Sequence, residues 1–362
     1  MDLRRLLLRL ASARPHVLLV ALPGATEARL AVEAELGRRG WAAAVSPADA
    51  DVLVVAGPPA PAMAAVVDRV WAQMPEPRVR VVVKAVAHVS GTLDAAASRL
   101  ADRAPGGPVG HPPEECTEAH DEGASAPGNS GGHEHGGPDH GGHEHGDMEM
   151  PGGLPMADLG EDRDGLMLDR LHVALGPVLP DWPAGLVLRV ALQGDVIQEA
   201  EAEVLDAGSG GSFWRDEDPR HLAGRHLDAL ARFLGVAGWA DPAARARRLR
   251  DELLAGAEPA AVRGQVHALT ARVRRSRTLR WLVRGIPAGE RDVAARLADR
   301  LAALDAAVDG IPSPQPGSSR PPDLAALARA VVGAEFAAAR LVVAVVDPDT
   351  DLVAAERGAR YA

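Results

Sequence analysis

The stretch of this chain richest in groups that can bind a metal ion runs from Gly131 to Met150 and reads GGHEHGGPDHGGHEHGDMEM. It is an imperfect repeat of His-Glu-His, with an Asp-His pair between the two copies. Imidazole and carboxylate groups on a flexible glycine-rich chain can wrap divalent nickel, zinc or copper. The candidate ligands, which include two upstream histidines, are His111, His120, His133, His135, Asp139, His140, His143 and His145. The alternative interpretation is a solvated low-complexity linker.

Cysteine chemistry is limited, because Cys116 is the single cysteine of the chain. One thiol excludes a disulfide within the chain. It also excludes an iron–sulfur cluster held by cysteines of this chain alone. Cys116 lies upstream of the histidine-rich tract, where it can contribute at most one further ligand.

Composition and charge exclude several functional classes. The 362 residues suffice for two domains, and the net charge of -11 argues against nucleic acid as the main partner. Arginine-rich helices are expected between Arg245 and Arg284, but acidic residues are interspersed among them and aromatics are few. That pattern favours a solvated or protein-docking face. The longest apolar tract, Leu324 to Val346, contains three charged residues that a membrane span would avoid. We therefore expect a cytoplasmic protein with at most peripheral membrane association through partners.

The segment from Ala50 to Val83 predicts a parallel βαβ unit around which the first 103 residues are organised. Two β-branched apolar runs, Val52–Ala56 and Val79–Val83, flank a helical pattern that ends before Pro75. Nearly continuous apolar strands are expected when both faces of a sheet are covered. A strand over 16–22, a helix over 26–39, a short extended segment over 41–45 and a helix over 86–103 complete a doubly wound α/β domain.

The remaining chain divides into a linker over 104–155 and a second domain over 156–362. The linker is rich in Gly, Pro, His, Asp and Glu and cannot bury enough apolar surface to offset its ordering entropy. The second domain is predicted to be a β-hairpin followed by a helical bundle. Its expected strands cover 186–192 and 196–204, and its expected helices cover 221–236, 241–254, 260–275, 293–308 and a tract from Asp323. Asp241 is the expected N-cap of the second helix.

The sequence motifs of the N-terminal region resemble those of the B subunit of NADH-quinone oxidoreductase (respiratory complex I) and of the small subunit of nickel–iron hydrogenases. In that family a strand similar to Ala50–Gly57 leads to a helix that ends in Met-Pro-Glu-Pro, here Met74–Pro77. The second domain resembles the D subunit of complex I and the hydrogenase large subunit. The sequence motifs shared with that family are Gly176-Pro177, Gly185–Arg189 and Gly194-Asp195.

The resemblance also implies where reactive groups would lie, and this chain has other residues there. The family's first cysteine pair falls at Gly24–Glu27, its third cysteine at Val86 and its fourth at His111. The quinone-pocket histidine of the D subunit falls at Ala184. We therefore expect no iron–sulfur cluster, and His172 is expected to be a structural or surface histidine.

The resemblance implies a fusion of B-like and D-like regions, and the loss of reactive residues leads us to expect a pseudoenzyme that is related to oxidoreductases and inactive alone. The first hypothesis is an accessory, assembly or regulatory protein that docks on respiratory NADH dehydrogenase or hydrogenase-type subunits. The second is a nickel or zinc storage or delivery protein that acts through the histidine-rich tract. The third is a redox subunit that works only with partner chains.

Overall fold

The computed structural model describes residues 14–102, 158–161, 167–207, 211–214, 218–311 and 321–353. The predicted linker over 104–155 lies outside the described residues, and so do residues 1–13. All described residues belong to one compact unit. The N-terminal and C-terminal regions are therefore parts of a single packed body.

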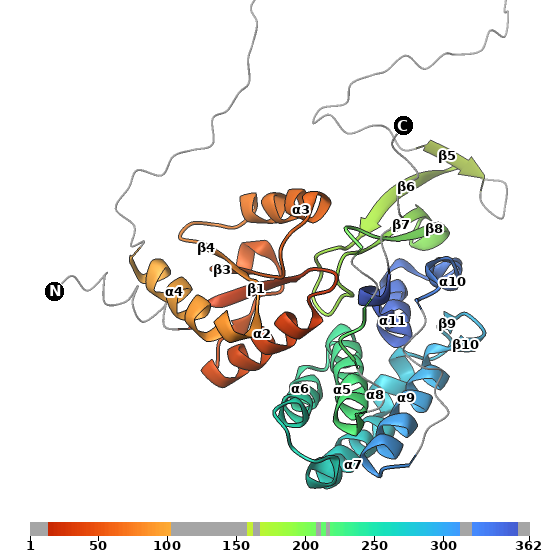
Figure 1. The fold of residues 1–362 in the computed structure, drawn as a ribbon. Helices are drawn as coiled ribbons and strands as arrows, with labels where there is room; N and C mark the ends of the chain where they lie inside the picture. Colours follow the sequence, from red (N-terminus) through yellow and green to blue (C-terminus); the bar gives the residue numbers. More distant parts are fainter. Residues whose placement is uncertain are drawn as a thin grey trace, which may run out of the picture. The chain divides into compact units, whose positions relative to one another are not determined.

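The N-terminal region is a parallel sheet covered by helices on both faces, as predicted (Figure 1). Its strands are β1 (His16–Ala21), β2 (Ala42–Ala43), β3 (Val52–Ala56) and β4 (Val79–Val83), in the order β2-β1-β3-β4. Helices α2 (Thr26–Arg39) and α4 (Val89–Asp102) cover one face and α3 (Pro61–Ala72) the other. The chain winds outward in both directions from β1 and β3, which makes the gap between these strands the topological switch point.

The sequence pattern explains these elements well. All five residues of β3 are buried, as a central strand covered on both faces requires. Met63, Val66, Val67 and Val70 form the buried stripe of α3. Gly40 ends α2 in the left-handed conformation, with φ of 65°.

The C-terminal region begins with an antiparallel sheet that is larger than predicted. Its order is β5 (Asp158–Glu161), β6 (Met167–Leu175), β7 (Leu186–Gln193) and β8 (Val196–Val204). The predicted hairpin is β7–β8, with Gly194 at φ of 61° in its turn. The prediction missed β5 and β6 because polar residues interrupt β6 and because Leu171 remains 55% exposed, so no clean alternation marks the strand.

Helices pack on β7 and form the larger core. They are α5 (Pro219–Val236), α6 (Ala240–Leu254), α7 (Pro259–Arg275), α8 (Arg277–Leu282), α9 (Val293–Val308), α10 (Leu324–Val331) and α11 (Phe336–Val346). A two-residue hairpin, β9 (Pro287–Ala288) and β10 (Arg291–Asp292), lies between α8 and α9.

Two details of the helical prediction were wrong. The tract from Asp323 is two helices, because Gly333 turns the chain with φ of 80° and residues 333–336 pair with the β7–β8 turn. Asp241 is not an N-cap: α6 begins one residue earlier, with Trp239 as its N-cap, and Asp241 lies in the first turn. There the carboxylate still interacts favourably with the helix dipole. Within the described ranges, no helix combines the length and apolarity that a membrane crossing needs.

Candidate functional site

The carboxyl edge of the parallel sheet is the place where a doubly wound domain binds its ligand. In this protein the edge is formed by the loops after β1 and β3, and the C-terminal region covers it. Gly185, at φ of 69°, comes so close that a Cβ there would lie 2.5 Å from Cγ of Pro23. Val178 and Leu205 pack against the core of the N-terminal region.

Two aspartates from the C-terminal region bind backbone amides at this edge. An Oδ1 atom of Asp351 accepts a hydrogen bond from the Gly24 amide at 2.7 Å, just before α2. An Oδ2 atom of Asp206 accepts one from the Met63 amide at 2.6 Å, in the first turn of α3. Unpaired amides and the helix dipole make such positions suitable for an anion. The chain therefore satisfies them with its own carboxylates.

A buried cluster of arginines and carboxylates joins α2 to α5 and α6. Arg29 Nη2 lies 2.7 Å from Asp228 Oδ2, and Arg29 Nη1 lies 2.8 Å from Glu33 Oε1. Arg250 Nη1 lies 2.6 Å from Asp228 Oδ1 and 2.7 Å from Glu33 Oε2. The side chain of Arg250 is fully buried, and only 1% of the Asp228 side chain is exposed. This four-residue arrangement, the interregion cluster, crosses between the N-terminal and C-terminal regions.

The electrostatics of the interregion cluster favour charged side chains. Burial by itself raises the pKa of Glu33, but Arg29 and Arg250 outweigh it and lower the pKa from its ordinary 4.5 to about 2. Burial also opposes ionisation of Asp228, and its arginine neighbours hold that pKa well below its usual range. Burial disfavours a charged Arg250, but Glu33 and Asp228 raise its pKa. The four side chains are thus held as two cations and two anions.

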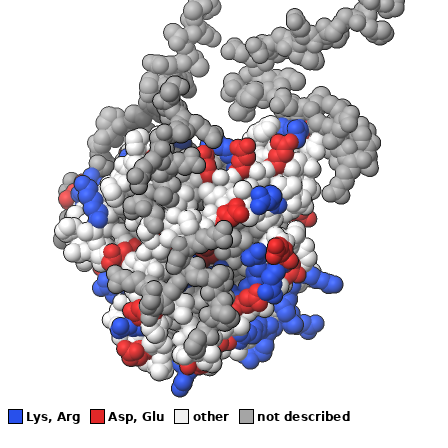
Figure 2. Space-filling model, turned by 45° about the vertical axis from the view of Figure 1, so that its right-hand side comes forward, with Lys and Arg blue, Asp and Glu red and all other residues white. Residues whose placement is uncertain are grey.

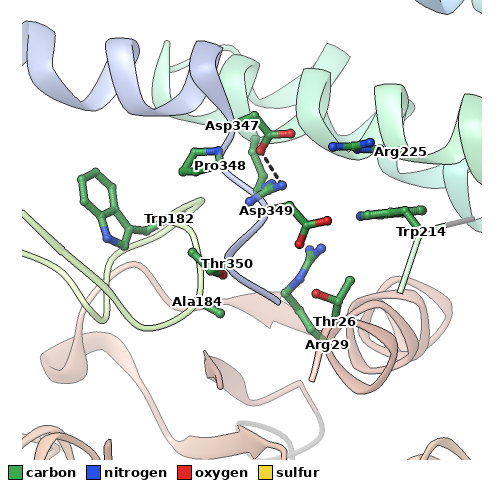
Figure 3. A pocket seen from close by; sticks show the side chains of 11 residues that line it. Thr26, Arg29, Trp182, Ala184, Trp214, Arg225, Asp347, Pro348, Asp349 and Thr350 are labelled. Atoms are coloured by element: carbon green, nitrogen blue, oxygen red, sulfur yellow. Dashed lines mark ion pairs between the residues drawn. The ribbon is translucent and has the colours of Figure 1, made fainter. Parts of the chain in front are cut away.

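A small cavity adjoins the interregion cluster (Figure 3). It is lined by residues of α2, of α5, of the loop before β7 and of the segment after α11, and its volume is about 30 Å³. Trp182 and Trp214 contribute to its wall, and Asp349 lies between them in the view of Figure 3. This volume admits about two water molecules.

The charged groups around this cavity are already engaged. Arg232 lies 2.5 Å from Asp347 and 3.4 Å from Asp228, and Arg29 is paired with Asp228. The Asp349 carboxylate accepts a hydrogen bond from the Ser212 hydroxyl at 2.6 Å. Burial raises the pKa of Asp349, against the opposing effect of this hydrogen bond. The arrangement suits bound water and structural ion pairs.

The structure brings together two of the positions that the resemblance singled out. Thr26, in the family's first cysteine segment, and Ala184, at the position of the quinone-pocket histidine, both line the cavity. Ala25 is buried beside Gly57, whereas Val86 is 42% exposed at the far side of the carboxyl edge, after β4. His172 is an exposed residue of β6. Neither thiols nor imidazoles stand at these described positions.

The predicted metal ligands are all outside the described residues. This applies to His111, His120, His133, His135, Asp139, His140, His143 and His145, and also to Cys116. Among the residues that the structure describes, no three His, Cys, Asp or Glu side chains are grouped so that they could hold a metal ion. Nickel or zinc binding by the tract therefore stays a prediction from the sequence.

Sequence reasoning missed every member of the interregion cluster. Arg29 and Glu33 are four residues apart in one helix, and so are Asp228 and Arg232. That spacing is usual for ion pairs on a solvated helix face. A weak signal was available in α5, where Asp228 sits between Leu227 and Ala229 in a helix with few polar residues on its inner side.

Comparisons of the chain with protein families, curated proteins and solved structures find no match.

Proposed function

We propose that this protein is a non-catalytic accessory, assembly or regulatory subunit of NADH-quinone oxidoreductase or hydrogenase-like machinery. The observation that carries the proposal is the closure of the sheet's carboxyl edge by the chain's own C-terminal region. The carboxylates of Asp351 and Asp206 accept hydrogen bonds from backbone amides at that edge, and Gly185 packs on Pro23. A surface that a related enzyme would use for a ligand is used in this chain for internal packing.

The choice of respiratory or hydrogenase-like machinery rests on the sequence resemblance alone. The N-terminal motifs of the resemblance lie on regular elements: β3 leads into α3, and Met74 after that helix is buried. Ala25, Val86 and Ala184 stand at the positions that the resemblance assigns to reactive groups. A fold that is retained while the reactive residues are replaced supports a role in docking, since a fold by itself does not specify an activity.

The proposal is tested on the intact protein. The purified chain is expected to be colourless and to show no turnover with NADH and a quinone. Anaerobic treatment with iron and sulfide is expected to give no more visible absorbance than in a Cys116→Ser control. A stoichiometric four-iron chromophore, or NADH oxidation by the isolated chain, would show that the protein is a redox subunit.

The partner is tested separately in native cells. Affinity purification of the tagged chain is expected to enrich respiratory or hydrogenase-type subunits, and deletion of the gene is expected to lower the amount of the assembled complex. Failure to enrich any such subunit, together with unchanged complex levels, would contradict the proposed partner while leaving the closed fold unaffected.

A further inference from the structure

One surface of the C-terminal region combines exposed arginines with an exposed tryptophan. The segment 274–284 contains five arginines and no acidic residue, in a chain whose net charge is -11. Trp281 is 76% exposed and Leu282 is 37% exposed. Figure 2 shows basic side chains gathered at the lower right of the face it draws, at the height of the helical bundle.

The geometry of α8 fixes which side chains point outward. Ser276 caps the helix, with its hydroxyl oxygen 3.2 Å from the Leu279 amide. Leu279 and Val283 are buried and anchor the inner side. At 100° per residue, Arg277, Arg280 and Trp281 of α8 then fall within one outward arc of about 100°. Arg284, in the turn after the helix, is also exposed. These four exposed residues are called the Arg–Trp face.

The arginines of the Arg–Trp face are not neutralised by the folded unit. None of the three arginines forms an ion pair with any residue that the structure describes; they are Arg277, Arg280 and Arg284. By contrast, Arg274 on the preceding helix lies 2.6 Å from Asp305. An indole surrounded by unpaired cations, on an anchored helix, is left for an external partner.

We propose that the Arg–Trp face binds an anionic lipid membrane surface. An indole has an apolar body and a polar N–H, and it settles at the boundary between headgroups and acyl chains. Arginines near an anionic membrane surface add electrostatic attraction. A stable protein interface needs a wide apolar core, whereas the apolar part here is one indole with the edge of Leu282. Single-stranded nucleic acid is disfavoured because one aromatic cannot stack successive bases.

The test measures binding of the full chain to lipid vesicles by co-sedimentation. Vesicles of phosphatidylcholine mixed with phosphatidylglycerol are expected to bind the protein, and pure phosphatidylcholine vesicles are not. Arg280→Gln with Arg284→Gln is expected to lower the partition coefficient about fivefold for each arginine removed. Trp281→Ala is expected to lower it at both low and high salt, because the indole contribution is not screened.

The matched control is Arg248→Gln with Arg263→Gln, which removes two exposed arginines of α6 and α7 that also lack ion pairs among the described residues. This control is expected to bind vesicles nearly as well as the unaltered chain. Circular dichroism checks that each variant is folded. Equal loss in both pairs, or no binding to phosphatidylglycerol vesicles, would overturn the proposal. Binding of a single-stranded oligonucleotide that depends on Trp281, without vesicle binding, would assign the face to nucleic acid instead.

Discussion

At the scale of single residues, Asp228 is the carboxylate on which the interregion cluster depends most. It contacts Arg29, Arg232 and Arg250 while its side chain is 1% exposed. Asp228→Ala leaves Arg29 and Arg250 buried with Glu33 as their remaining shared carboxylate. We expect the free energy of unfolding to fall by about 3–5 kcal/mol. Urea unfolding followed by circular dichroism measures this change.

The control for this substitution is Asp241→Ala. Asp241 pairs with Arg272 at 2.6 Å, but its side chain is 72% exposed. Removing an exposed pair is expected to change the free energy of unfolding by about 0–1 kcal/mol. Equal effects of the two substitutions would mean that the cluster around Asp228 is not buried in solution.

Glu33 gives the protein a defined pH dependence. Its pKa is lowered to about 2, chiefly because Arg29 and Arg250 outweigh the effect of burial. The ionised form therefore contributes stability that is fully present above the ordinary pKa and is lost as the pH falls towards 2. Asp181, Asp251 and Asp349 have pKa values raised by burial, which act in the opposite direction.

Comparison with Glu33→Gln reports the contribution of Glu33 together with the effect of its charge on the pKa values of Asp181 and Asp251. We expect the difference in their free energies of unfolding to shrink by about 3 kcal/mol between about pH 6 and pH 2. Urea midpoints over this range provide the measurement. A difference that does not vary with pH would show that Glu33 is not ion-paired.

The histidine-rich tract carries a prediction that depends on sequence alone. Calorimetry with nickel or zinc is expected to find several sites in the intact chain, with affinity falling as the pH drops through the range of about 6–7 where histidine becomes protonated. Deleting residues 131–146 is expected to remove most sites and to leave the thermal transition nearly unchanged. Unchanged metal stoichiometry after the deletion would place the metal elsewhere.

The same residues show why the site could not be predicted. Ion pairs four residues apart within a helix, such as Arg29 with Glu33, are ordinary on exposed faces. Only the docking of α2 on α5 and α6 turns them into a buried cluster, and that docking joins residues about 200 positions apart. Asp351 and Asp206 are likewise recruited by long-range packing, which no local pattern records.

At the scale of elements, Gly185 tests the contact that closes the sheet edge. It has φ of 69°, and a Cβ there would lie 2.5 Å from Pro23 and 2.9 Å from the carbonyl oxygen of Leu205. Gly194, at φ of 61°, has no atom within 4 Å of the same position. Gly194→Ala should therefore cost only about 1 kcal/mol of conformational strain.

Gly185→Ala should cost about 1–3 kcal/mol more than this, because the added methyl group must displace the Pro23 ring of the opposing region and the nearby carbonyl of Leu205. Both variants are compared by urea unfolding. Equal losses in the two variants would indicate that the loop carrying Gly185 does not press on the β1–α2 loop.

Local patterns sufficed for some elements and not for others. A continuous run of apolar residues was enough to predict β3 at 52–56, and one apolar stripe was enough to predict α3. The strands β5 and β6 were missed because their alternation is interrupted and their partners lie further along the chain. The split between α10 and α11 depends on pairing of Ala334 and Phe336 with the β7–β8 turn, which is again a long-range effect.

At the scale of the whole molecule, the described residues act as one unit in which the C-terminal region closes the N-terminal sheet. The proposed docking role uses outer surfaces of this unit, and the Arg–Trp face is proposed to bind a lipid membrane instead. A closed sheet edge is the feature of this unit on which the proposed docking role rests.

The central claim, that this edge is closed, is tested most directly by hydrogen exchange with mass spectrometry on the intact chain. Peptides that contain the amides of Gly24 and Met63 should exchange as slowly as peptides of α5, because Asp351 and Asp206 hold these amides. In Asp228→Ala this protection should fall together with that of α5. Rapid exchange around Gly24 and Met63, with β3 and α5 still protected, would contradict the account and show that the edge is open.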